Sequence, residues 1–208
     1  EQSEILDDAI LNFKKITGKH PVAFRAGGFG ATDITLKLLS QKGINVDCSY
    51  MESGKGCNIT YESCSLNVEN MSEIPMSPVI LFSFKGKKIR TLSIDFNWLP
   101  LIQIKRIIKK LYFQNAKTIV LLMHSSSMCV RIGKNKFLYR KNHYEKLDSL
   151  LNHIKKNGYN IVTVSDLSEN GDFFQGKDYK NSTYIETNIF FQYATILFQS
   201  LKGAGFKI

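Results

Sequence analysis

The sequence predicts a protein of the α/β class, built from parallel strands with helices between them. Helical and strand patterns alternate through most of residues 3–168, and this order is typical of parallel sheets. The chain has 208 residues, of which 43% are hydrophobic, and this is enough for one sizeable core. We therefore expect a single domain whose strands form either a barrel or an open sheet.

Helices are predicted where apolar residues recur every three or four positions, and strands where short apolar runs lie between turn residues. The expected helices are residues 3–17 with Gly18 as a stop, Thr32 to Gly43, 101–112, 144–157 with Gly158 as a stop, and a short helix capped by Ser165. The expected strands are 22–24, 44–46, 78–84, 118–123 and 161–164. The run TIVLLM at 118–123 is expected to be the most strongly buried strand.

The remaining segments have no clear period. Residues 51–72 mix small and polar residues, and such long irregular excursions often carry function. After the domain of residues 1–168, we expect a linker at 169–188 and an apolar C-terminal helix and tail at 189–208.

The net charge of +10 suits an anionic partner, either nucleic acid, a phospholipid surface or an acidic glycan. The basic residues lie in scattered pairs such as Lys14-Lys15 and Lys155-Lys156, without a dense run or a nucleic-acid module, so no nucleic acid is expected as partner. No apolar stretch is long enough to predict a membrane span.

Three of the predicted strands are each followed by a polar residue that is poorly suited to burial. Arg25 follows the first strand, Asp47 the second and His124 the run at 118–123. The carboxyl ends of parallel strands lie on one face, where active sites are assembled, so we expect these residues to converge. Singly, each has a simpler interpretation: an ion-pair arginine, a turn aspartate and a buried histidine.

A glycine cluster follows Arg25. Gly27, Gly28 and Gly30 permit unusual backbone angles and the close approach of a ligand to main-chain N–H groups, although a tight turn before a helix explains them equally well. Their spacing does not match a dinucleotide-binding loop. Ser125 follows His124, but no serine-hydrolase elbow surrounds it, and the cysteines lack zinc-site spacing.

Four stretches together resemble the polysaccharide deacetylases, the NodB-homology carbohydrate esterases. They are KKITGKHPVAFRAGGFGATDITLKLLSQKGINVDCSY, SEIPMSP, IVLLMH and YEKLDSLLNHIKKNGYNIVTVSDL. The order of these features is similar to the second half of that family, in the branch found with capsule and lipopolysaccharide biosynthesis. The resemblance implies a distorted (β/α) barrel, incomplete at its N-terminus, and hydrolytic removal of an acetyl group from a sugar of a surface polysaccharide.

The resemblance also implies roles for particular residues. His124 matches the general acid of an L-x-H motif, and Arg25 matches an arginine that orients the catalytic aspartate. The backbone at Gly28 matches an oxyanion-hole donor, and Asp47 matches the aspartate of a DSS segment. We therefore expect His124 and Arg25 to be catalytic, and the oxyanion and substrate-binding part to comprise Gly27, Gly28, Phe29, Asp47 and Ser125.

The metal of this family is a divalent cation such as zinc, cobalt or nickel. Its usual ligands are an Asp-Asp motif and an H-x-x-x-H motif. The pair Asp7-Asp8 lies in a predicted amphipathic helix, where we expect it to be solvated, and no H-x-x-x-H occurs in residues 1–208, so the resemblance implies that the ligands lie upstream of Glu1. The expected partner is an acetylated carbohydrate, which could be acidic. The alternative function is a catalytically inactive, metal-free relative that binds glycans.

Overall fold

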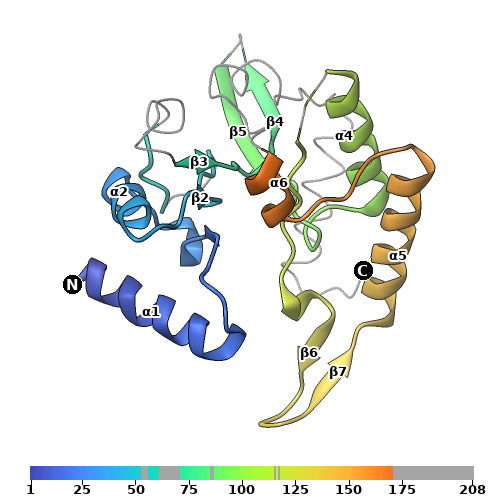
Figure 1. Cartoon of the computed structure of the whole chain (residues 1–208). Coiled ribbons are helices and arrows are strands. Elements are labelled where there is room, and N and C mark those ends of the chain that lie inside the picture. Colours follow the sequence, from blue (N-terminus) through green and yellow to red (C-terminus); the bar gives the residue numbers. More distant parts are fainter. Residues whose placement is uncertain (53–55, 61–70, 85–86, 115, 117, 171–208) are drawn as a thin grey trace. The chain divides into compact units, whose positions relative to one another are not determined.

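A computed structural model describes residues 1–52, 56–60, 71–84, 87–114, 116 and 118–170 (Figure 1). The described residues group into two compact units. Unit 1 comprises Glu1–Met76 together with the described residues from Val162 onward. Unit 2 comprises Ser77–Ile161. The predicted linker at 169–188 and the predicted helix at 189–208 lie almost entirely outside the described residues.

Unit 1 contains a three-stranded parallel sheet with the strand order β1-β2-β3. Its strands are β1 (Ala23–Phe24), β2 (Val46–Asp47) and β3 (Ser72–Glu73). The register places Asp47 opposite both Phe24 and Glu73. This short sheet therefore aligns the carboxyl ends of three segments that lie far apart in the sequence.

The helices of unit 1 begin and end where the local sequence predicts. Helix α1 (Gln2–Thr17) ends at Gly18, which has φ 72° and donates its amide to the Lys14 carbonyl. Helix α2 (Asp33–Gln41) begins after Thr32, which forms a reciprocal capping box with Thr35. The apolar faces of both helices pack into one core, whose buried residues are Leu6, Ala31, Leu36, Leu39, Ile44 and Ile59.

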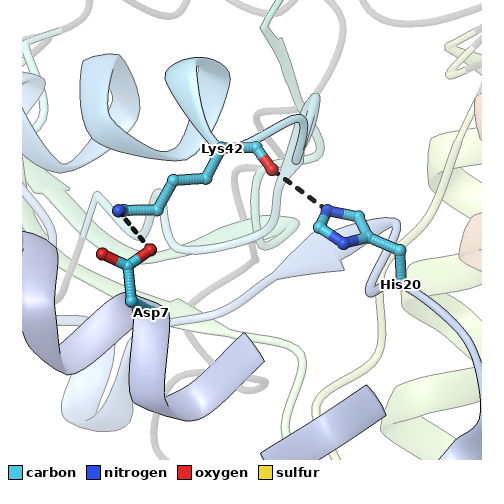
Figure 2. Close-up of polar contacts among 3 residues, drawn as sticks. All are labelled: Asp7, His20 and Lys42. Carbon is cyan, nitrogen blue, oxygen red and sulfur yellow. Dashed lines mark hydrogen bonds and ion pairs between the residues drawn. The ribbon is translucent and has the colours of Figure 1, made fainter. Parts of the chain in front are cut away.

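Polar contacts join α1 to the end of α2, as Figure 2 shows. Lys42 Nζ lies 2.6 Å from Asp7 Oδ1, and His20 Nε2 lies 3.0 Å from the Lys42 carbonyl oxygen. A carbonyl only accepts, so His20 donates through Nε2 and satisfies one of the carbonyl groups that the end of a helix leaves without a partner. The side chain of Lys42 thus binds α1, and its backbone carbonyl binds His20 in the segment that follows α1.

Unit 2 combines an antiparallel pair with two helices. Strands β4 (Pro78–Phe84) and β5 (Lys87–Ser93) pair with each other, and helices α4 (Leu101–Phe113) and α5 (Lys141–Lys156) contact one another. Their shared core contains the buried side chains Val79, Ile94, Phe96, Leu99, Ile104, Ile107, Ile108, Leu111 and Leu150.

Lys146 of α5 stabilises the turn that follows β5. Its ammonium group donates to the carbonyl oxygens of Phe96 and Leu99, the latter at 2.7 Å, and lies 4.5 Å from the centroid of the Phe96 ring. These contacts satisfy two backbone carbonyls and add a cation–π interaction. Lys146 therefore connects α5 to the segment that enters α4.

The structure corrects two predicted strands. Residues 118–123 form no regular strand, and only Leu122 makes a bridge, to Asp95, while Met123 is 38% exposed. The pairing does not extend beyond Leu122, because the neighbouring chain turns at Asp95. The Asp95 Oδ1 atom accepts from the Asn97 and Trp98 amides in this turn.

Residues 161–164 form no strand either. Helix α6 (Val164–Asn170) begins here, because the side chains of Thr163 and Asp166 bond each other's backbone amides as a capping box. The cap is therefore Thr163, and the predicted cap at Ser165 is wrong.

The strand pairing departs from the expected all-parallel arrangement. Strands β4 and β5 are antiparallel, as are two strands that the sequence did not predict, β6 (Cys129–Arg131) and β7 (Phe137–Tyr139). The described strands form separate small sheets, and none of these is closed into a barrel. The barrel implied by the family resemblance thus stays a prediction.

Two isoleucines of α4 provide a matched test of the unit 2 core. Ile104 is fully buried and Ile102 is 60% exposed. We expect Ile104→Ala to lower the free energy of unfolding by about 2–5 kcal/mol, because it removes buried methyl groups and leaves a cavity. Ile102→Ala should change it by less than about 0.5 kcal/mol. Urea unfolding followed by circular dichroism measures both, and equal effects would contradict the assignment of the core face.

Candidate functional site

The candidate site of unit 1 lies at the carboxyl ends of its three parallel strands. Arg25 directly follows β1, Asp47 ends β2, and Glu73 ends β3. Strands in a parallel sheet all present the same end to one edge, so these ionisable residues share that edge. Arg25 is exposed, whereas Asp47 and Glu73 are buried.

The carboxylate of Asp47 is fully buried and bonded to Ser49. Ser49 donates its amide to Asp47 Oδ2 at 2.9 Å and its hydroxyl to Asp47 Oδ1 at 2.8 Å. This is the aspartate-turn geometry that the simpler interpretation of Asp47 allowed. Across the strand pair, Glu73 Oε1 accepts from the Tyr50 amide at 2.9 Å.

Asp47 and Glu73 interact directly, because they are partners in the register of two neighbouring strands. Burial raises the pKa of both carboxyl groups; the neighbouring Asp47 charge raises that of Glu73 further, to well above its usual range. If both groups were carboxylates, neither could donate a hydrogen bond to the other, and Glu73 Oε2 would be buried without a hydrogen-bond partner. From the raised Glu73 pKa and the absence of a partner for Oε2 among the described residues, we infer that the pair holds one proton, carried by Glu73 and shared with Asp47, and therefore one negative charge.

This network continues into the glycine-rich loop. The hydroxyl oxygen of Ser49 accepts from the Ala26 amide at 2.9 Å, and the Cys48 amide donates to the Phe24 carbonyl at 2.8 Å. Ser49 therefore holds the loop that begins at Arg25, and Asp47 in turn holds Ser49.

The loop adopts a backbone that glycine favours. Gly27–Phe29 form one 3-10 turn (η1), and both Gly28 and Phe29 have positive φ, 59° and 61°. A non-glycine residue with positive φ is uncommon and marks local strain. Within the described part of the chain, the amides of Gly27 and Gly28 have no hydrogen-bond acceptor, and both glycines are exposed. Two main-chain donors are thus available to a ligand.

A second segment covers the loop on another side. A Cβ atom at Gly56 would lie 3.1 Å from the Gly28 carbonyl oxygen, which is closer than an ordinary contact. The segment is held there because the Asn58 amide donates to the Ala31 carbonyl at 2.9 Å. This part of the irregular region 51–72 therefore approaches the loop backbone so closely that an added Cβ atom would require the backbone to shift by a few tenths of an ångström.

The Arg25 guanidinium lies over the ring of Phe29, with Cζ 6.0 Å from the ring centroid. None of the described carboxylates forms an ion pair with Arg25, so the simpler interpretation as an ion-pair arginine finds no partner there. Burial and the nearby Glu73 and Asp47 charges raise the pKa of Cys48 to about 12. Cys48 is therefore a protonated, unreactive thiol near neutral pH.

His124 and Ser125 belong to unit 2. His124 is exposed, and the buried Ser127 hydroxyl accepts from its amide at 3.1 Å, which fixes the backbone of the turn η2 (Ser125–Ser127). The His124 imidazole has no hydrogen-bond partner among the described residues, so it is not the buried, satisfied histidine of the simpler interpretation.

Five of the predicted site residues therefore come together in unit 1: Arg25, Gly27, Gly28, Phe29 and Asp47. Whether His124 and Ser125 converge with them stays a prediction, because they belong to the other unit. The sequence reasoning missed Ser49 and Glu73. Glu73 lies in the SEIPMSP stretch and directly precedes buried Ile74, and a charged residue at the start of an apolar run was the available signal.

The described residues contain no group of three or more histidine, cysteine, aspartate or glutamate side chains that could hold a metal ion. None of the helices in the described ranges is both long and apolar enough to cross a membrane. Comparisons with protein-family models, with curated protein sequences and with solved structures found no match to this chain.

The shared proton predicts how stability depends on pH. Because the Glu73 pKa is higher in the folded than in the unfolded chain, the folded state keeps a proton that the unfolded state has lost. The free energy of unfolding should therefore fall as the pH rises above the ordinary glutamate value of 4.5. In Glu73→Gln, whose amide donates to Asp47 at every pH, this decline should be smaller.

Urea unfolding of both proteins across this pH range measures the difference. Glu145→Gln, at an exposed position of α5, is the control and should leave the wild-type decline unchanged. Parallel curves for the wild type and Glu73→Gln would contradict the shared proton.

Two adjacent glycines test the loop backbone. Gly28→Ala should lower the free energy of unfolding by about 1–2 kcal/mol, because φ is +59° there. Gly27→Ala should change it by less than about 0.5 kcal/mol, because its φ is not in the left-handed region and no atom lies within 4 Å of an added Cβ. Chemical denaturation compares them, and equal losses would argue against the left-handed conformation at Gly28.

Proposed function

We propose that this chain contributes the oxyanion-binding and proton-donating parts of a sugar deacetylase that acts on an acetylated surface polysaccharide. In the reaction, water adds to the acetyl carbon, the carbon–nitrogen or carbon–oxygen bond breaks, and the leaving atom receives a proton. The products are acetate and a free amine or hydroxyl on the sugar.

The observation that supports this proposal most is the exposed loop beside Arg25. Its Gly27 and Gly28 amides, which have no acceptor among the described residues, are the kind of donors that stabilise the negative charge of a tetrahedral intermediate. They are held by the Ser49 contact to Ala26, so little reorganisation is needed when charge develops. In this proposal Asp47, Ser49 and Glu73 are positioning residues, since their polar atoms are directed at the loop and at each other.

The proposed role of His124 is that of general acid toward the leaving group. Its exposed imidazole, on a turn whose backbone is fixed by Ser127, is free to reach a substrate. The proposal requires units 1 and 2 to meet at the substrate.

A divalent metal is part of the proposal through the family resemblance, and it would supply an activated water. The described residues do not form a site that fits it, so its ligands would have to come from outside the described ranges.

The test is acetate release from acetylated polysaccharide by the full-length protein, after loading with zinc, cobalt or nickel. His124→Ala should lower kcat/KM by about 10²–10⁴-fold with an unchanged thermal unfolding temperature, because a general acid contributes about that much. His153→Ala, at a half-buried position of α5, is the control histidine and should keep full activity.

Two outcomes would contradict the proposal. Equal activity of His124→Ala and wild type would remove the general acid. Retention of the polysaccharide without acetate release, in protein with stoichiometric metal, would instead identify a glycan-binding relative.

A further inference from the structure

Strands β6 and β7 form a two-stranded hairpin that no other described strand of unit 2 joins. Its register pairs Cys129 with Tyr139 and Arg131 with Phe137, and the Ile132 amide donates to the Lys136 carbonyl at 2.9 Å. Figure 1 shows its tip pointing away from α4 and α5 of the same unit. All of residues 131–142 are exposed.

The hairpin carries only positive charge. Between residues 129 and 141 there are five cations and no acidic residue. The cations are Arg131, Lys134, Lys136, Arg140 and Lys141. The Arg131 side chain donates to the carbonyl oxygens of Gly133 and Lys134 at 3.0 and 2.5 Å, so one of these charges also shapes the turn. The hairpin is thus suited to an anionic partner.

The hairpin also exposes large apolar side chains. Ile132, Phe137, Leu138 and Tyr139 are 56–64% exposed. Since paired residues share a face, Leu138 and Ile132 lie on one face and Phe137 and Tyr139 on the other. A two-stranded hairpin has no interior in which to bury them, and it is marginally stable alone in water. A partner that receives both apolar groups and positive charge would stabilise it.

We propose that this hairpin docks on the anionic surface of a phospholipid bilayer. Its lysines and arginines would lie at the level of the lipid phosphates, and its aliphatic and aromatic tips would enter the interface. This inference does not depend on the proposed enzymatic function.

Other anionic partners fit the hairpin less well. Isoleucine and leucine gain nothing from a hydroxyl-rich glycan or from a phosphate backbone, because neither offers an apolar phase. A second copy of the chain would bring five further cations against these five, which is unfavourable in a symmetric contact. A bilayer with acidic headgroups satisfies both the charge and the aliphatic surface.

The first experiment is co-sedimentation of the purified full chain with vesicles. Vesicles containing phosphatidylglycerol should bind the protein at least about tenfold more tightly than phosphatidylcholine vesicles, and salt should weaken the binding. Equal partition to both vesicles, or no binding to either, would overturn the proposal.

Paired variants then locate the contact. Lys134→Glu/Lys136→Glu should lower the binding about tenfold or more, whereas Lys155→Glu/Lys156→Glu makes the same charge change on α5 and should lower it much less. Phe137→Ser/Leu138→Ser should lower binding, whereas Ile5→Ser/Ile16→Ser, at exposed positions of α1, should not. Circular dichroism checks that each variant is folded. Equal losses within either pair would overturn the assignment to the hairpin.

A fluorescent reporter distinguishes insertion from simple attraction. The chain has one tryptophan, Trp98, so Trp98→Phe/Phe137→Trp moves the reporter to the hairpin. Its emission should shift to shorter wavelength with phosphatidylglycerol vesicles, while Trp98→Phe/Ile16→Trp should not shift. Retention on heparin or RNA that depends on Phe137 and Leu138, without any shift on vesicles, would assign the hairpin to a glycan or a nucleic acid instead.

Discussion

Two carboxyl groups, those of Asp47 and Glu73, face each other inside unit 1 because their strands are parallel and in register. Neither group forms an ion pair with a described cation, and two adjacent charges cannot both stay ionised where water is excluded. One proton between them resolves the conflict. The remaining charge on Asp47 then accepts both donors of Ser49, and Ser49 holds Ala26. The conformation of the glycine-rich loop therefore rests on this buried acid pair.

In this arrangement, the residues that support the loop are not the groups that the loop exposes to a ligand. The polar atoms of Asp47, Ser49 and Glu73 are used within the protein, while Arg25 and the amides of Gly27 and Gly28 remain exposed. A strained backbone at Phe29 can persist because the Ser49 contact on one side and the Gly56 segment on another restrict the loop. An edge built in this way presents donors that are already oriented, which is the property that oxyanion stabilisation requires.

Local signals predicted much of the fold. Periodic apolar residues followed by Gly18 or Gly158 located α1 and α5, and Thr32 located the start of α2. The errors arose where the outcome depends on distant partners. The apolar run 118–123 could form a strand only by pairing along its length with a neighbouring extended segment. The segment that it pairs with turns at Asp95, so only one bridge forms.

The candidate site shows the same limit. Arg25, Asp47 and the glycines were recognisable because each follows a predicted strand. Glu73 was not recognised, because β3 is too short for a pattern and the role of Glu73 comes entirely from its pairing with Asp47. Likewise, the apolar residues of β6 and β7 did not predict a strand pair, since no core covers them.

The account depends on the protonation of Glu73, and carbon NMR of the labelled chain measures it directly. A pH titration of the side-chain carboxyl carbons should give Glu73 the chemical shift of a protonated acid well above the ordinary glutamate pKa of 4.5, with Asp47 ionised beside it. Two carboxyl groups that both ionise at their ordinary values, without influence on each other, would contradict the shared proton and the loop support that follows from it.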